Sequence, residues 1–571
     1  MDLKPLLFFL LFLNLGSCCS AQNFQLRLIG NTKSETKTID SLQYHPNHKN
    51  TKSLQDEIIR ITAQLAKIGF IENSITENLK INDTSYVTKL TLGNRIKTIH
   101  IYIGRNNEVY NAIVPEKTKD TIVIRYEETE AFLQDASQKL EQKGFALASV
   151  KLANIQNKKQ TLYADLAFTA DKKRKLNAIE IKYAENSNTI HFPKGYLAQI
   201  NRNYQNKIFN QNIVNEVHHE FEKFKFANQV KYPEILFTED STKIYVYLEK
   251  RKSNTFDGFI GFSNNENKKI IFNGYADITL ENTLRAGEQF SLFWKSDGNR
   301  QKTFKTSIEV PYAFKSPIGL KASLTIFKQD STYQNTKTGI DLGYFIHYNT
   351  RIYLGYQATE SSDIQNTNSE QLRDYKNSFL TTAFEYTKND TDNSLFQKKS
   401  TLSLLAGLGK RNSSNPSETT TANKQFYVHI EMMHNFYLNQ KNCINLRSQN
   451  YYLQSDTYII NELFRFGGIN SIRGFEENSF QANFLTSILT EYRYILSPSL
   501  YIHSIIDYAI YKDKSNSAAN NQKTSLAGLG LGLGLQTKNG LLKLAFANGT
   551  IKNQNFNFYN TIIHICYNVK F

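Results

Sequence analysis

The strongest constraint on the fold of this chain is the alternation of apolar and polar residues in its C-terminal half. The segment 561–571 reads TIIHICYNVKF and places Ile563, Ile565, Tyr567, Val569 and Phe571 on one face of a strand. One apolar face over about ten residues is typical of a β-strand that crosses a membrane. No internal apolar run reaches the ~18 residues that a membrane helix needs. The pattern therefore predicts a membrane-spanning antiparallel β-barrel.

The same alternation extends upstream to about Thr255. In LAGLGLGLGLQ, residues 526–536, the leucines at 529, 531, 533 and 535 occupy one face, and the glycines at 528, 530, 532 and 534 occupy the other. The glycines lack the G-x-G-x-x-G spacing of a nucleotide-binding loop, so we interpret them as facing a crowded barrel interior. Polar stretches at 357–377, 409–424 and 511–525 indicate long loops, and 313–317 indicates a short turn. The region has room for about 16 strands at roughly 20 residues per strand and connection.

Three repeats of mixed helix and strand precede the barrel region. Residues 53–73 and 129–144 show helical spacing of apolar residues, and LAKIGF at 65–70 is echoed by LEQKGF at 140–145. A weaker third copy, FEKFKF, follows at 221–226. Ser53 and Asp56 suggest a capping box at the first helix. With flanking strand patterns, we expect α+β domains at 22–115, 116–174 and 175–252, and a barrel at 253–571.

The first 21 residues predict export. A basic start, an apolar run and small residues before a cleavage point after Ala21 are typical of a signal peptide. Leu15-Gly16-Ser17-Cys18 also resembles a lipobox, in which Cys18 would be lipidated. Cleavage after Ala21 would leave Cys443 and Cys566, which are too few for a disulfide framework.

The formal net charge of +16 does not indicate nucleic-acid binding, because the lysines are scattered rather than clustered. His218-His219 lacks the H-E-x-x-H spacing of a zinc site, so we expect no metal. No pattern of nucleophile and base or of paired carboxylates indicates catalysis. We therefore expect neither an enzyme nor a cofactor.

One motif needs a separate explanation. Residues 464–480 read FRFGGINSIRGFEENSF and place Arg473 among glycines inside the barrel region. A guanidinium withdrawn from water requires charged partners. Alternation in the next two strands turns Glu491 and Asp507 inward, together with Arg493 and His503. We expect Arg473 to pair with Glu491 or Asp507; the alternative is a surface-loop arginine in a porin. Glu476 and Glu477 are expected to be solvated.

The three repeats resemble polypeptide-transport-associated (POTRA) domains, and FGGINSIRGF resembles the signature of the outer-membrane assembly-barrel superfamily. The matching residues are Gly467, Gly468, Ile472, Arg473, Gly474 and Phe475. The resemblance implies that this motif tips a long loop folded back into the barrel, where Arg473 meets carboxylates at Glu491 and Asp507. Ile505-Ile506-Asp507 lacks the Phe of the family F-x-D motif. Tyr567, Val569 and Phe571 form the C-terminal barrel signature.

The resemblance also implies a function. POTRA domains in the periplasm would capture β-rich client polypeptides, and the barrel would insert or export them at the bacterial outer membrane. Its partners would be unfolded outer-membrane or secreted proteins, membrane lipids and accessory periplasmic or lipoprotein subunits, with no nucleic acid. Two alternatives remain open, a dedicated two-partner secretion pore and a simple porin or receptor.

Overall fold

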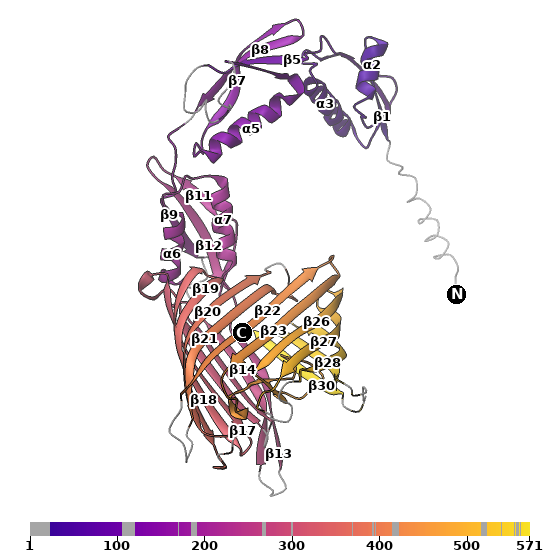
Figure 1. Ribbon diagram of the computed structural model, residues 1–571. Helices are drawn as coiled ribbons and strands as arrows, with labels where there is room; N and C mark the ends of the chain where they lie inside the picture. Colours follow the sequence, from indigo (N-terminus) through magenta and orange to yellow (C-terminus); the bar gives the residue numbers. More distant parts are fainter. Residues whose placement is uncertain are drawn as a thin grey trace, which may run out of the picture. The chain divides into compact units, whose positions relative to one another are not determined.

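The computed structural model describes residues 23–104, 113, 120–169, 171–183, 191–264, 270–297, 301–367, 369, 371–390, 393, 395–413, 422–515, 522–537, 540–552, 554, 559 and 561–570. The predicted signal peptide at 1–21, including Cys18, lies outside these residues. Figure 1 shows small α/β domains followed by the strands of a barrel. The chain divides into two compact units, Met1–Lys175 with Lys207–Ile213, and Leu176–Asn206 with Val214–Phe571.

The first α/β domain is a four-stranded sheet with two helices. Helix α3 buries Leu54, Ile58, Ile61 and Leu65, which recur at helical spacing. Its N-cap is Asn50, whose side chain accepts the Ser53 N–H at 2.8 Å, so the predicted capping box at Ser53 is wrong. The sheet order is β2-β1-β4-β3. The elements are β1 (Phe24–Gly30), α2 (Lys33–Asp40), β2 (Asn47–His48), α3 (Thr51–Lys67), β3 (Ser74–Lys80) and β4 (Ser85–Thr91).

The second domain begins earlier than the predicted boundary at residue 115. Strand β5 pairs with β6 and, in parallel, with β8, in a sheet of order β6-β5-β8-β7. The alternation of Ile99 and Ile101 identified a strand but not its partners, because alternation shows only which face is buried. The elements are β5 (Thr98–Tyr102), β6 (Thr121–Arg125), η2 (Tyr126–Glu128), α5 (Thr129–Gln142), β7 (Ser149–Lys158) and β8 (Thr161–Thr169).

The third domain is built around β12, which pairs in parallel with β9 and antiparallel with β10 and β11. Val214, Val217 and Phe221 are fully buried on α7, as their spacing predicted. Helix α6 was not predicted. The elements are β9 (Ala178–Tyr183), α6 (Lys194–Tyr204), α7 (Gln211–Glu222), β10 (Ala227–Gln229), β11 (Glu234–Phe237) and β12 (Thr242–Lys250).

Sixteen antiparallel strands form the barrel sheet, which confirms the predicted fold class. Six strands, β19 to β22 with β27 and β28, extend into stretches predicted as loops, because polar residues remain paired beyond the apolar band. The strands are β13 (Thr255–Asn264), β14 (Ile270–Glu281), β15 (Gln289–Asp297), β16 (Gln301–Val310), β17 (Ile318–Gln329), β18 (Tyr333–His347), β19 (Thr350–Asp363), β20 (Tyr375–Asn389), β21 (Lys398–Ser413), β22 (Ala422–Tyr437), β23 (Asn442–Gln454), β26 (Phe484–Ser497), β27 (Leu500–Lys512), β28 (Thr524–Gln536), β29 (Gly540–Ile551) and β30 (Ile562–Lys570).

The outer face of the sheet is apolar. Leu342 and Leu354 are cross-strand partners, and their side chains are 51% and 58% exposed. The leucines at 529, 531 and 535 are also exposed, as their alternation with glycines predicted. A continuous exposed surface of this kind is typical of contact with lipid.

Among the described residues, no helix has the length and apolarity to span a membrane.

The first and last strands of the barrel sheet meet over a short seam. β13 and β30 pair at three positions, Thr255 with Lys570, Phe256 with Val569 and Asp257 with Asn568. By contrast, β13 and β14 pair over ten positions. The first and last strands of the barrel sheet are thus paired at the N-terminal end of β13. Of the C-terminal signature, Val569 lies in this seam, Tyr567 is partly exposed, and Phe571 lies outside the described residues.

Candidate functional site

A loop between β23 and β26 is packed against the inner wall of the barrel. Its base is a two-stranded hairpin of β24 (Phe464–Phe466) and β25 (Phe480–Ala482). Phe466 and Ile472 are buried with Leu485, Ala509 and Leu526 of the neighbouring strands β26, β27 and β28. Burial of these apolar side chains therefore helps to hold the loop against this wall, independently of any ion pair.

Arg473 lies at the tip of this loop and is 2% exposed. Its Nε and Nη2 atoms donate to the two carboxylate oxygens of Asp507 at 2.7 and 2.6 Å. Its Nη1 donates to Glu491, and its backbone N–H donates to Asp507 at 3.0 Å. A bidentate arginine-carboxylate pair is short and directional. The predicted contacts of Arg473 with Glu491 and with Asp507 are therefore both present.

Glu491 joins Arg473 to a larger charge cluster. Its second carboxylate oxygen accepts from Nε of Arg493 at 2.8 Å, and Arg447 lies 3.6 Å from its first. Three guanidinium groups thus surround two carboxylates. Both carboxylates are buried, and a buried charge is tolerated only when it is paired and hydrogen-bonded. Loss of one member would leave the others uncompensated.

Two glycines on adjacent strands, Gly528 and Gly549, lie directly against the loop backbone, and we call this pair the seat of the loop. Asp507 of β27 pairs with Gly528 of β28, which pairs with Gly549 of β29. A Cβ atom on Gly528 would lie 2.2 Å from the Arg473 carbonyl oxygen, and one on Gly549 would lie 2.6 Å from that of Gly474. The loop backbone therefore rests directly on the wall, where only glycine fits. The sequence indicated that Gly528 faces the interior, whereas Gly549 was missed.

The remaining motif residues shape the loop. Gly467, Gly468 and Gly474 have φ values of 113°, 93° and 89°, which favour glycine. The Phe475 ring packs against Phe480 at a centroid distance of 5.1 Å. Glu477 was predicted to be solvated but forms an ion pair with Lys295 of β15 at 2.9 Å. The sequence around a loop glutamate does not indicate which residue on the opposite side of the barrel it pairs with.

A second buried ion pair, missed from the sequence, holds the start of the loop. Glu462 lies in the short 3₁₀ helix η4 (Ile460–Glu462), pairs with Arg411 of β21 and accepts from Gln425. The Asn461 side chain donates to Ser361 at 2.7 Å. The alternation of residues in β21 indicates that the Arg411 side chain faces the barrel interior. Nothing in the sequence indicates which residue it pairs with. The loop is thus anchored by ion pairs on two sides of the barrel.

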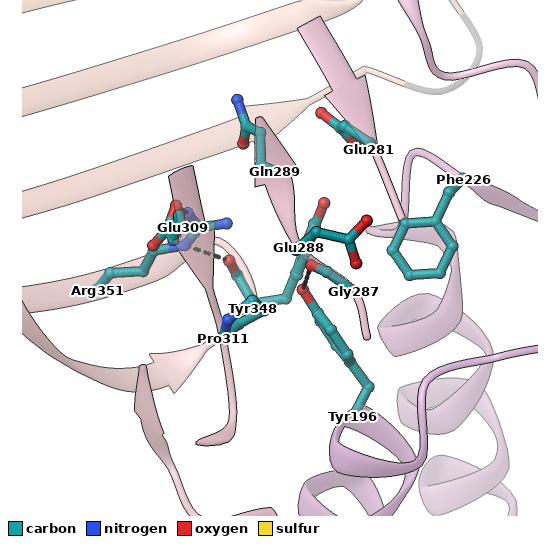
Figure 2. Close-up of a pocket in the computed structure, with 10 residues that line it drawn as sticks. All are labelled: Tyr196, Phe226, Glu281, Gly287, Glu288, Gln289, Glu309, Pro311, Tyr348 and Arg351. Atoms are coloured by element: carbon teal, nitrogen blue, oxygen red, sulfur yellow. Dashed lines mark hydrogen bonds and ion pairs between the residues drawn. The ribbon is translucent and has the colours of Figure 1, made fainter. Parts of the chain in front are cut away.

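The third domain contacts the barrel through Tyr196 of α6. Its hydroxyl donates to the Gly287 carbonyl at 2.9 Å, as Figure 2 shows, and its ring meets Tyr312 edge-on at 4.6 Å. Burial raises the pKa of this hydroxyl well above its usual value. Nearby, Lys225 pairs with Glu281 of β14 at 2.8 Å. This domain and the barrel belong to one compact unit.

The barrel interior retains a cavity of about 620 Å³ beside the charge cluster. Arg473, Glu491, Arg493 and His503 line one side, and Asp257 and Asp277 line another. Among the described residues, no group of three or more His, Cys, Asp or Glu side chains could hold a metal ion. His218 instead contacts Gln229 at 2.9 Å.

Comparison with known proteins gives a family match over most of the barrel region. Residues 282–561 match the model of the Omp85 superfamily domain. The chain carries an Omp85 superfamily domain. The resemblance that the FGGINSIRGF motif suggested is thereby confirmed. A search of curated protein sequences gave no significant match.

Solved structures show the same fold. BamA from Haemophilus ducreyi lacking POTRA domains 1–3 is similar with a TM-score of 0.50 at 15% identity, over 83% of this chain and 100% of its own. CdiB from Acinetobacter baumannii is similar with a TM-score of 0.50 at 12% identity, over 91% of this chain and 98% of its own. At these identities the likeness shows the fold, with POTRA-like domains before the barrel.

Arg473→Ala should weaken the barrel without unfolding it. The substitution leaves Asp507 buried without its cation, which typically costs on the order of 3–5 kcal/mol. Arg473→Lys should restore only part of this loss, because an ammonium cannot fork both carboxylate oxygens. The measurement is the temperature at which the compact, fast-migrating form is lost on gels. An unchanged temperature in Arg473→Ala would contradict the proposed role of the pair.

Gly528→Ala tests the seat of the loop independently of charge. The added methyl group would meet the Arg473 carbonyl and displace the loop, at a typical overpacking cost of about 1–3 kcal/mol. Gly339→Ala in β18 is the matched control, since its Cβ would approach only the Ser323 hydroxyl. Protease should therefore cleave the loop of Gly528→Ala more readily than that of Gly339→Ala. Equal cleavage would show that the loop does not rest on Gly528.

Proposed function

We propose that this Omp85 protein inserts or exports β-rich polypeptides at the bacterial outer membrane, with its α/β domains in the periplasm. The observation that carries the proposal is the Arg473 loop inside the barrel. Gly528 and Gly549 make room for its backbone, and two carboxylates and an apolar cluster hold it there. A simple diffusion pore requires no such loop and no preceding α/β domains, so the porin alternative has less support.

Client capture would use the free edges of the α/β sheets. Strand β3 is an edge strand of the first sheet, and all seven of its residues are exposed. Ile75 and Leu79 expose 50% and 42% of their surfaces there. An extended client can add to such an edge through backbone hydrogen bonds, with apolar side chains adding affinity.

Release into the membrane would use the seam between β13 and β30. Its three residue pairs are few compared with the ten between β13 and β14. Fewer ladder hydrogen bonds make this joint the easiest one to open sideways, and no cofactor or energy source is needed for the opening. A client strand could then pair with an exposed barrel edge.

A dedicated secretion pore remains the second candidate. The fold of CdiB from Acinetobacter baumannii matches this chain as well as that of BamA does, so the fold does not separate the two. The two candidates differ instead in the number of client proteins that each would serve. A secretion pore would serve one exported partner, whereas an assembly factor would serve several outer-membrane proteins.

The β3 edge provides the test. In the double variant Ile75→Lys and Leu79→Lys, charges on the edge strand should prevent strand addition, so client levels fall while the barrel still assembles. The matched control is Ile59→Lys, since Ile59 is 64% exposed in the same domain but lies on helix α3. The measurement is quantitative proteomics of outer-membrane and secreted proteins. Loss of a single secreted protein would favour the pore, and no change in any protein would refute capture by β3.

A further inference from the structure

A cleft lies where helix α6 of the third domain meets the outer surface of strand β18. It has a volume of about 100 Å³ and is lined by Gln199, Arg202 and Asn203 from α6 and by Tyr344, Ile346 and His347 from β18. All of these residues belong to one compact unit. We refer to this feature as the α6–β18 cleft. Neither the motif loop nor client capture accounts for it.

The floor of the cleft is formed by direct contacts between α6 and the turn that joins β16 and β17. Gln199 donates to the Lys315 carbonyl, and Tyr196 packs against Tyr312 in the turn between β16 and β17. A Cβ atom on Gly195 would lie 3.0 Å from the Tyr312 carbonyl oxygen, so the helix and the turn are in close contact. The two walls of the cleft are therefore joined by direct contacts at its floor.

The apolar surface of the barrel continues into the cleft. Tyr344 and Ile346 expose 53% and 43% of their surfaces, and Ile318, the cross-strand partner of Tyr344, exposes 40%. Phe314 is fully exposed in the adjoining turn at a φ of 53°. Large aromatic residues are uncommon in this left-handed region. Exposed aromatic rings beside a lipid-facing band are typical of the membrane-water interface.

The mouth of the cleft carries an excess of positive charge. Arg202 lines the cleft, and Lys315, whose carbonyl accepts from Gln199, follows Phe314 in the adjoining turn. Both residues are exposed, and within the described parts of the chain neither forms an ion pair. Glu220 also lines the cleft, but Lys223 holds its carboxylate at 2.5 Å. The imidazole of His347 lines the cleft as well. The mouth therefore offers cations to a ligand while the adjoining wall offers apolar side chains.

We propose that the α6–β18 cleft binds the headgroup of an anionic phospholipid. Arg202 and Lys315 would hold the phosphate, because a guanidinium donates to two phosphate oxygens at once and an ammonium adds a point charge. The acyl chains would lie along Ile318, Tyr344 and Ile346. A bound lipid would join the third domain to the bilayer at the point where it meets the barrel. The proposal depends on the membrane barrel and not on the proposed client function.

The test uses the full chain in phosphatidylcholine vesicles with and without phosphatidylglycerol. Phosphatidylglycerol should raise the temperature at which the folded form is lost in the wild type. The double variant Arg202→Glu and Lys315→Glu should lose most of this rise. The matched control is Arg27→Glu with Lys33→Glu, which makes the same charge change at exposed positions of the first domain. An equal rise in the cleft variant and in this control would overturn the proposal.

Two further arms separate the sources of the effect. Inorganic phosphate added to phosphatidylcholine vesicles should not reproduce the rise; if it does, the cleft binds free phosphate and the lipid assignment is wrong. Arg202→Gln serves if the double variant does not fold. It should retain less phosphatidylglycerol than the wild type in native mass spectrometry after extraction, and equal retention would also overturn the proposal.

Discussion

A single buried guanidinium determines much of the organisation inside this barrel. Arg473 is almost fully removed from solvent, and the cost of burying its charge is offset by Asp507 and Glu491. To bring these groups together, the loop must return to the wall of β26 and β27. The adjoining strands β28 and β29 must in turn carry glycine at 528 and 549, because any side chain there would displace the loop backbone.

The two sides of the barrel differ in how firmly they are held. The loop contacts β26, β27 and β28 through Arg473 and β29 through Gly474. It reaches β21 through the pair of Arg411 and Glu462. It also reaches β15 through Glu477. The seam of β13 and β30, by contrast, is joined at three positions. The internal ion pairs would allow this seam to open while the rest of the barrel keeps its shape, as the proposed insertion of clients requires.

Sequence alone predicted the features that follow from local periodicity. Alternation shows which side chains face inward, so the pattern of β26 and β27 was enough to assign Glu491 and Asp507 to Arg473. Periodicity does not show which strands are neighbours. Strand β5 was therefore assigned to the wrong domain, and Arg411 could not be paired with Glu462. The Asn50 cap was missed because Ser53 offered an equally plausible capping residue three positions later.

The most direct measurement asks whether Arg473 itself holds the loop inside the barrel. Ser471 lies beside Arg473 and donates to Gln449 of β23 at 2.9 Å. Cysteines at 471 and 449, in a chain with Cys443 and Cys566 replaced by serine, should be joined by a short bifunctional thiol reagent. The same pair should join poorly when Arg473→Ala is added. Equal yields with and without Arg473, or no joining in the parent chain, would contradict the account.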